Sequence, residues 1–397
     1  MKASRDLMRD ANTSLVINLV KGAGSLSRAD LARESGLSPA TVSGIVGRLI
    51  QRGIVNEVAV GPSNGGRPPV ILRLNEVAGY VIGIKLRGSG LTTVITDLGA
   101  EVKHSREVAA NLVGDPQAAI ERIAGAVQSL LADSRVKRSK LLGIGLGLPG
   151  VVDASAGVCH YSHLLGWQNV PLQEPLRRRL KVPVLVDNDV NTLAVADRWF
   201  GAGAGVRHFL TVTVGRGVGL GIVINGDVYR GTVGGAGEFG HVVVADGPLC
   251  ECGRSGCLEA LVSEPALRKR ASAALGRPIT SRELVELASS GEPTVTGVLA
   301  VGGRQLGMAV VNLVALFNPE RLIVSGEGTE LGPAFFDPMI EAIRENTFAD
   351  LGSQLDIVIE PWGDDAWAVG AATLVLRELF NLPIRTEQPR LNLLVGA

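Results

Sequence analysis

Residues 249–257 read LCECGRSGC and hold three of the four cysteines of this 397-residue chain. Thiolates this close in sequence can bind a metal, form a disulfide or remain buried thiols. His241 lies shortly upstream and offers a fourth ligand. Three thiolates and one imidazole would make a closed tetrahedral zinc site, which leaves no position for a catalytic water. The cluster is therefore a DNA-reading zinc finger, a disulfide, or a brace for another site.

Spacing alone leaves a simpler alternative for this cluster. His241 can be a core histidine, and the three cysteines can be buried thiols. The fourth cysteine, Cys159, lies outside the cluster, and we expect it to be a free thiol.

The N-terminal sequence and the hydropathy pattern indicate a cytoplasmic protein. The chain opens MKASRDLMRD, whose charges interrupt any apolar signal-peptide core. No stretch reaches the ~18 uninterrupted apolar residues that a membrane span needs, so we expect no membrane partner. A reducing compartment disfavours a structural disulfide, which leaves metal binding or buried thiols to explain the cysteine cluster.

Length and charge divide the chain into a basic N-terminal module and a larger remainder. With 397 residues, 46% of them hydrophobic, the chain can build two or three cores. Up to Asn75 there are 10 Lys and Arg against 5 Asp and Glu, which leaves 29 against 34 in the rest. A basic module of this kind is typical of a domain that binds a polyanion such as DNA.

The basic module has the periodicity of a helix-turn-helix. Residues 27–53 predict a short helix, a turn at 35–37 and a second helix, with Ser38 as its N-cap and Pro39 at its first position. One face of the second helix is apolar, and the opposite face carries short polar groups followed by cations. This face suits contacts with base edges and phosphates. The candidate DNA-binding residues on it are Ser38, Thr41, Ser43 and Arg48.

The segment that follows predicts a β-hairpin wing. Residues 54–75 alternate like two short strands around a loop that contains GGRPP, and an extended Arg67 there can enter a narrow minor groove. The alternative is a small helical domain with an ordinary surface loop. Gly44 and Gly47 each lower the stability of the predicted recognition helix by about 1 kcal/mol relative to Ala. Close packing or close approach to DNA would explain why glycines stand at these positions.

From Gly79 onwards the pattern is that of an α/β fold with two lobes. A helix is predicted over 116–132. Runs typical of buried strands occupy 79–86, 91–97, 141–148, 182–187, 209–214, 220–225, 321–325 and 355–360.

Several of these predicted strands end in polar or glycine-rich turns. Gly150 lies in GLPGVVD, Asn188 and Asp189 in DNDVN, and Glu238 with His241 in GGAGEFGH. The turn at 214–217 is rich in glycine, as phosphate-binding turns are, but one such turn is weak evidence. A lone Asp or Glu is usually a solvated surface group.

Taken in order, GLPGVVD, DNDVN, GRGVGLGIV, GGAGEFGH and CECGRSGCLE resemble the ROK family of repressors, uncharacterised reading frames and sugar kinases. The resemblance covers residues 79–397, and the N-terminal module resembles the DNA-binding domain of the family's repressors. It implies an actin-like sugar-kinase fold behind a winged helix-turn-helix. We expect the DNA-binding domain over 1–77, a first lobe over 78–190, and a second lobe over 191–397 whose C-terminal helix returns to the first lobe.

The resemblance also implies two sets of site residues. In the family, a structural zinc ion pins the segment of Glu238 to that of Glu259, so the cysteine cluster would brace a sugar pocket, and His241 would serve both metal and sugar. The implied zinc ligands are His241, Cys250, Cys252 and Cys257. The implied sugar-binding residues are Gly150, Asn188, Asp189, Glu238, His241 and Glu259.

Three departures from the family pattern concern kinase chemistry. Asp189 matches the base of the family's kinases. However, Lys85 replaces the acid of the first phosphate loop, Arg216 stands in the second loop where threonine is usual, and Glu327 stands near paired glycines. Lys85 and Arg216 can bind an anion such as a sugar phosphate, but they do not restore a magnesium site. We therefore expect no ATP and no catalytic residue.

These observations predict a sugar-responsive transcriptional regulator, a repressor of genes for carbohydrate uptake or catabolism. A two-fold symmetric homodimer, or a homotetramer, would bind a pseudo-palindromic DNA operator. One rival is an ATP-dependent sugar kinase that carries a DNA-binding arm. Another is a scaffold whose lobes bind a protein and no small ligand.

Overall fold

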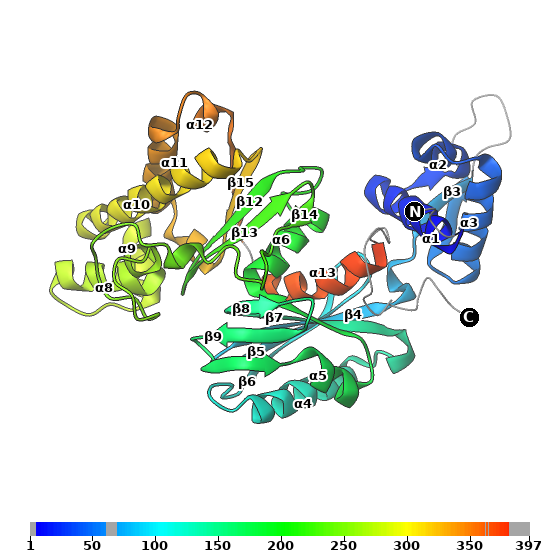
Figure 1. Cartoon of the computed structure of the whole chain (residues 1–397), viewed down its shortest axis with the longest axis horizontal. Coiled ribbons are helices and arrows are strands. Elements are labelled where there is room, and N and C mark those ends of the chain that lie inside the picture. Colours follow the sequence, from blue (N-terminus) through cyan, green and yellow to red (C-terminus); the bar gives the residue numbers. More distant parts are fainter. Residues whose placement is uncertain (1–4, 61–69, 362, 364, 381–397) are drawn as a thin grey trace.

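The computed structural model describes residues 5–60, 70–361, 363 and 365–380, which form a small N-terminal domain and a larger domain of two lobes (Figure 1). The N-terminal domain consists of three helices and a three-stranded antiparallel sheet of order β1-β3-β2. Its elements are α1 (Arg5–Ala23), β1 (Leu26–Ser27), α2 (Arg28–Ser35), α3 (Pro39–Gln51), β2 (Val55–Val60) and β3 (Val70–Leu74).

Local sequence signals fix the helix-turn-helix. Ser27 and Asp30 form a capping box at the start of α2, and Gly36 ends that helix with a left-handed φ of 68°. Ser38 caps α3 by accepting a hydrogen bond from the Thr41 amide, and Pro39 occupies the first helical position. The predicted caps and turn are confirmed. The predicted apolar stripe of α3 is buried at Val42, Ile45, Val46 and Leu49.

The first lobe contains a five-stranded sheet of order β11-β7-β4-β5-β6. Strands β4, β5 and β6 form an antiparallel meander, and β7 and β11 add to it in parallel. A small sheet of order β10-β9-β8 lies beside it. The elements are η1 (Glu76–Ala78), β4 (Tyr80–Arg87), β5 (Gly90–Thr96), β6 (Val102–Ala109), α4 (Pro116–Ser134), η2 (Arg138–Lys140), β7 (Leu141–Leu148), β8 (Val151–Asp153), β9 (Val158–Ser162), β10 (Trp167–Pro171), α5 (Gln173–Leu180) and β11 (Val184–Asn188).

The second lobe repeats the same strand arrangement, in the order β14-β13-β12-β15-β16. Its first three strands are again an antiparallel meander, and its last two are again parallel additions. The elements are α6 (Asp189–Phe200), β12 (Phe209–Val214), β13 (Val218–Ile224), β14 (Asp227–Val228), η3 (Phe239–His241), α7 (Glu259–Val262), α8 (Glu264–Leu275), α9 (Ser281–Ser289), α10 (Pro293–Phe317), β15 (Arg321–Ser325), η4 (Glu327–Leu331), α11 (Pro333–Asn346), α12 (Leu351–Gln354) and β16 (Asp356–Ile359).

The last described helix, α13 (Ala366–Phe380), leaves the second lobe and packs on strands β4 and β7 of the first (Figure 1). Two glycines of the sheet make this approach possible. A Cβ at Gly83 would overlap the Ala368 carbonyl oxygen, and one at Gly145 would overlap that of Ala371. Only glycine allows the backbone of α13 to lie directly on the sheet.

Helix α10 is, among the described helices, the one long and apolar enough to cross a membrane. Half of its most apolar window is buried inside the protein. Its buried residues, among them Leu299, Leu306 and Val310, belong to the core of the second lobe. This burial is typical of the core helix of a globular domain.

Candidate functional site

The junction of β11, in the first lobe, and α6, which leads into the second lobe, forms one side of a cleft. Asn188 ends the strand and caps the helix, because its Oδ1 accepts hydrogen bonds from the amides of Val190 (2.8 Å) and Asn191 (3.2 Å). Its Nδ2 donates to the carbonyl oxygen of Gly150 at 3.0 Å. Gly150 has a φ of 114°, and a Cβ there would overlap the Tyr161 carbonyl oxygen. The Gly150 turn and Asn188 are therefore held together.

Asp189, the residue that matches the kinase base, is engaged in an ion pair. Lys85 Nζ donates to Asp189 Oδ2, and both side chains are largely buried, with 12% and 10% of their surface exposed. The Lys85 ammonium also lies 4.1 Å from the ring centroid of Trp367 on α13. The Asp189 oxygen that accepts from Lys85 is therefore already engaged in a hydrogen bond.

Sequence reasoning identifies both members of this pair but not the pairing. Lys85 departs from the family's acid, and Asp189 matches the family's base. They are 104 residues apart in sequence, and only the parallel pairing of β4, β7 and β11 brings their strands together. A basic residue in place of an acid, in a chain that keeps the other acid, is the signal that could have suggested the pair.

Glu238, His241 and Glu259 form the second-lobe side of the cleft. Burial raises the pKa of Glu238; the charges of Asp189 and Glu259 raise it further, while His241 opposes them. Glu238 is thus a buried acid with the charges of Asp189 and Glu259 nearby. Glu259 begins α7, and its Oε2 accepts a hydrogen bond from the Val218 amide at 3.0 Å.

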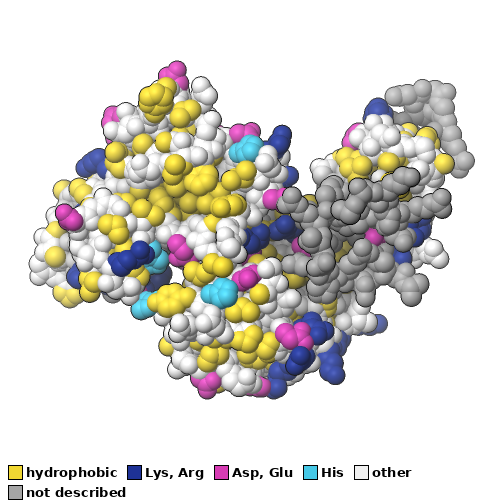
Figure 2. Space-filling view, viewed as in Figure 1, with side chains coloured by type: hydrophobic (Ala, Val, Ile, Leu, Met, Phe, Trp, Pro, Cys, Tyr) yellow, Lys and Arg dark blue, Asp and Glu magenta, His cyan; other side chains and the backbone are white. Residues whose placement is uncertain are grey.

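A second ion pair connects the two lobes beside the cleft. Arg230 of the second lobe contacts Asp187 Oδ2 at 2.6 Å, and Asp187 is fully buried at the end of β11. The other oxygen of Asp187 accepts from the Asn188 amide (2.8 Å) and from Asn191 Nδ2 (3.2 Å). The surface is hollowed between the lobes (Figure 2). Sequence reasoning does not single out Asp187 or Arg230.

The cysteine cluster has the geometry of a metal site. The ligand atoms of His241, Cys250, Cys252 and Cys257 all lie within 4.8 Å of one another. His241 Nδ1 is 3.7 Å from Cys250 Sγ, and the sulfurs of Cys252 and Cys257 are 3.6 Å apart. Tetrahedral zinc with Zn–S bonds of about 2.3 Å separates two sulfurs by about 3.8 Å. The four side chains therefore fit a zinc ion.

This cluster lies directly against Glu259, an acid of the implied sugar site. Its Oε1 is 4.0 Å from Cys250 Sγ. The cysteines are not joined by disulfides. Cys159, in contrast, is buried in the first lobe, where burial raises the pKa of its thiol to about 11.

The turn between β12 and β13 does not offer a free phosphate cradle. A Cβ built at Gly215 would overlap Glu327 Oε2, so that carboxylate covers the turn. Arg216 contacts Glu251 at 2.9 Å. Lys85 and Arg216, the two cations that sequence analysis suggested for binding an anion, are therefore each already paired with a carboxylate. An acidic group over the turn opposes the binding of a polyphosphate.

The exposed face of α3 contains the described DNA-binding candidates. Ser38, Thr41, Ser43 and Arg48 are all exposed. Ser38 Oγ accepts from the Thr41 amide at 3.2 Å, so its first role is that of a helix cap. Arg67 lies outside the described residues.

Gly44 and Gly47 lie on this same exposed face. Among described atoms, a Cβ at Gly44 would meet only Arg48 Nη1, at 3.8 Å, and one at Gly47 would meet nothing within 4 Å. Packing inside the described part of the chain therefore does not require either glycine.

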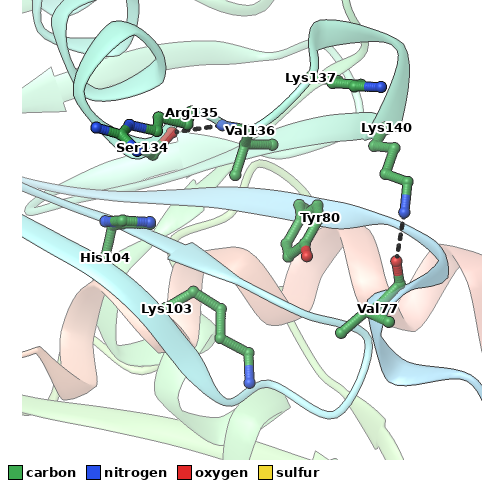
Figure 3. A pocket seen from close by; sticks show the side chains of 9 residues that line it. All are labelled: Val77, Tyr80, Lys103, His104, Ser134, Arg135, Val136, Lys137 and Lys140. Atoms are coloured by element: carbon green, nitrogen blue, oxygen red, sulfur yellow. Dashed lines mark hydrogen bonds between the residues drawn. The ribbon is translucent and has the colours of Figure 1, made fainter.

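A separate cavity of about 540 Å³ opens on the first lobe (Figure 3). Two of its cations have partners: Lys103 pairs with Asp97 (2.8 Å), and Lys140 Nζ donates to the Val77 carbonyl oxygen (3.0 Å). No residue implied for sugar or zinc lines it. The lining residues are Val77, Tyr80, Lys103, His104, Ser134, Arg135, Val136, Lys137 and Lys140.

Comparison with known proteins identifies the family of this chain. Residues 81–378 match the ROK family model, and residues 9–56 match a winged helix-turn-helix DNA-binding model. The chain belongs to the ROK family. The predicted family and fold are confirmed.

Relatives along the whole chain are regulators. The xylose repressor of Bacillus subtilis (strain 168) is 27% identical over 96% of this chain and 98% of its own length. The DNA-binding transcriptional dual regulator NagC of Escherichia coli (strain K12) is 30% identical over 95% of each chain.

Solved structures separate the regulators from the kinases. A ROK family transcriptional regulator, a homologue of the E. coli MLC protein, matches with a TM-score of 0.84 at 27% identity, over 94% of this chain and 97% of its own. A ROK family glucokinase from Streptomyces griseus matches with a TM-score of 0.66 at 28% identity, over 75% of this chain and 99% of its own. The kinase is almost fully covered, yet a quarter of this chain has no counterpart in it. The chain therefore has the architecture of a DNA-binding transcriptional regulator, with an N-terminal domain that this kinase lacks.

Proposed function

We propose that this protein is a cytoplasmic, sugar-responsive repressor that controls genes of carbohydrate uptake or catabolism. The observation that carries the proposal is the joining, in one chain, of an exposed recognition helix to an acid-rich cleft whose kinase base is paired with Lys85. The relatives named xylose repressor and N-acetylglucosamine repressor support a sugar as the effector.

The cleft supplies the groups that bind a polyol. Carboxylates accept hydrogen bonds from sugar hydroxyls, and the Asn188 amide and Gly150 turn add a donor and a close backbone contact. We propose Gly150, Asn188, Asp189, Glu238, His241 and Glu259 as the sugar-binding residues.

A structural zinc ion is the second part of the proposal. His241, Cys250, Cys252 and Cys257 would hold it, with all four positions filled by protein. Its chemistry is therefore structural, and it fixes the loop that carries Glu238 next to the start of α7 at Glu259.

The DNA-binding part rests on α3. We propose Ser38, Thr41, Ser43, Arg48 and, from the wing, Arg67 as contacts to the DNA. A homodimer or homotetramer would place two such helices on the half-sites of a pseudo-palindromic operator.

Selection of genomic fragments by the purified protein tests the proposal. At near-physiological salt, we expect retention of a palindromic site beside genes for sugar transport or catabolism. Retention of random fragments only, with and without added sugars, would contradict the proposal.

The variant Gly44→Ala tests the DNA face specifically. The Cβ enters open space, so the helix should gain up to about 1 kcal/mol of stability. If DNA approaches this face, the affinity for the selected fragment should nevertheless fall. Gly125→Ala, in exposed space on α4, is the matched control and should leave the affinity unchanged.

A further inference from the structure

Two packed helices begin at the cleft and end at the N-terminal domain. Helix α6 starts with Asp189 and ends at Phe200; α13 carries Trp367 at its start and ends at Phe380. At the cleft end they hold the two partners of Lys85, since its ammonium pairs with Asp189 and lies over Trp367. Along their length they pack closely, and a Cβ at Gly370 would meet the Thr192 backbone at 3.2 Å.

The other ends of both helices contact one lysine of α1. Lys21 Nζ donates to the carbonyl oxygen of Trp199 at 3.0 Å. Its ammonium lies 3.9 Å from the ring centroid of Phe200, 5.1 Å from that of Trp199 and 5.5 Å from that of Phe380. We call Trp199, Phe200 and Phe380 the aromatic seat of Lys21.

The aromatic seat combines groups that attract a cation with burial that disfavours its charge. A carbonyl in the last turn of α6 lies at the negative end of the helix dipole, and aromatic faces attract an ammonium. Burial and the neighbouring Arg198 lower the pKa of Lys21 to about 8, so the charge is held there at a cost. Asn18 adds a hydrogen bond from its Nδ2 to the Phe380 carbonyl oxygen, at 2.6 Å.

The packing partners of α13 differ between its two ends. Near the cleft, the backbone of α13 lies on Gly83 and Gly145. Near α1, Leu379 and Phe380 share one hydrophobic core with Ile17 and Ile54 of the N-terminal domain, around a void of about 50 Å³. Helix α13 therefore connects the sheet of the first lobe to the core of the N-terminal domain by direct packing.

We propose that α6 and α13 together transmit the state of the cleft to the DNA-binding domain, and that Lys21 is the residue that positions this domain on them. The inference rests on the proposed sugar-binding function. A sugar hydroxyl competes with Lys85 for Asp189, so the paired and unpaired states of Asp189 are the two states to be transmitted. The N-terminal domain responds because α6 and α13 end at its seat.

A double-mutant cycle tests this without any sugar. The full-length wild type, Asp189→Asn, Lys21→Met and the double variant are compared by hydrogen exchange of the α1 amides over residues 14–23. Asp189→Asn should change exchange there by about fivefold or more. In the Lys21→Met background the same change should have less than about a twofold effect. Equal effects in both backgrounds, or no effect in the wild type, would overturn the proposal.

Three further variants test whether the effect on α1 depends on the cleft ion pair and on the charge of Lys21. Lys85→Met breaks the cleft pair from its other side and should act on α1 as Asp189→Asn does. Lys21→Arg, which keeps the charge, should restore part of the coupling. Lys269→Met removes an exposed cation on α8 and should leave the α1 amides unchanged.

The same proteins separate this inference from the proposed function. If no genomic fragment is selected, the regulator proposal fails, and the exchange cycle still reports on coupling. If a fragment is selected, added D-xylose or N-acetylglucosamine that changes its affinity in the wild type should not do so in Lys21→Met. A sugar response retained in full by Lys21→Met would overturn the role of Lys21.

Discussion

The two lobes share one strand order but hold the cleft in different ways. In the second lobe, Glu259 accepts a hydrogen bond from the Val218 amide and lies 4.0 Å from Cys250 Sγ of the cysteine cluster. On the opposite side, Lys85 of the first lobe pairs with Asp189 at the start of α6 and lies over Trp367 of α13, and both helices reach the N-terminal domain. We call the second-lobe side of the cleft, which the cysteine cluster adjoins, the braced wall. The opposite side, with the Lys85–Asp189 pair, is the side from which a change can reach the N-terminal domain.

The same comparison explains why the repeated turns differ. The family pattern implies an acid of a phosphate loop at the position of Lys85 in β4, and paired glycines beside the nucleotide near Glu327, which covers the β12–β13 turn. In each lobe, a charged side chain therefore lies at a position that a kinase would need for binding its nucleotide. Strand topology alone does not preserve an activity, because function depends on the residues at the strand ends.

Removal of a zinc ligand should give the largest effect and would test the braced wall. Cys252→Ser should lose the metal, lower the thermal stability of the second lobe and abolish sugar binding, because structural zinc contributes folding energy directly. Metal content by mass spectrometry and thermal unfolding measure these losses. Cys159→Ala, at the buried thiol outside the cluster, should keep its metal; a protein without zinc in the wild type would refute the brace.

Loss of one charge in the braced wall should have the next largest effect. Glu259→Gln keeps the size of the side chain but removes a charged acceptor, which is worth about 1.5–3 kcal/mol. Sugar affinity should fall by about 10- to 100-fold in calorimetric titrations. Glu251→Gln, an exposed acid that contacts Arg216, is the control and should bind sugar normally.

A methyl group under α13 should disturb the first lobe moderately. Gly145→Ala places a Cβ against the Ala371 carbonyl oxygen, and overpacking of this kind costs about 1–3 kcal/mol. Urea unfolding should show the loss, and metal content should not change. Gly125→Ala in the same lobe should instead stabilise it, since its Cβ meets no described atom. Equal effects of the two substitutions would contradict the close packing of α13 on the sheet.

The pH dependence of stability should show the smallest effect, at the contact between α6 and β12. Burial, with a contribution from Glu360, raises the pKa of Asp197 to about 7, while the hydrogen bond from Thr211 opposes this. Between the ordinary pKa of 3.8 and about 7 the folded state holds a proton that the unfolded state releases. Its stabilising contribution is therefore full below that range and is lost as the pH rises through it to about 7.

Asp197→Asn removes this dependence. Relative to the variant, the wild type should become less stable as the pH is raised from about 5 to about 8, in urea unfolding at each pH. A stability difference that does not vary with pH would show that Asp197 is ionised throughout.

Much of the architecture could be predicted from the sequence, because its signals are local. The caps at Ser38 and Pro39, the apolar stripe of α3 and the strand runs are each encoded within a few residues, and the structure contains all of them. The cysteine spacing likewise indicates a metal cluster, and the structure brings the four side chains together.

The features that sequence reasoning missed depend on contacts between distant segments. The pairs Lys85–Asp189 and Arg230–Asp187, and the seat of Lys21 on Trp199, join residues that no local pattern connects. Their geometry arises only when the sheet orders and the return of α13 are known. Charge and aromatic content indicate the groups but not their partners.

The most direct test of the account is the affinity of the protein for its selected genomic fragment, measured with and without D-xylose and N-acetylglucosamine. The account predicts specific binding that one of these sugars changes by about fivefold or more in the wild type and leaves unchanged in Glu259→Gln. Specific binding that no sugar alters, or an equal response in Glu259→Gln, would contradict the claim that the cleft is the effector site of a repressor.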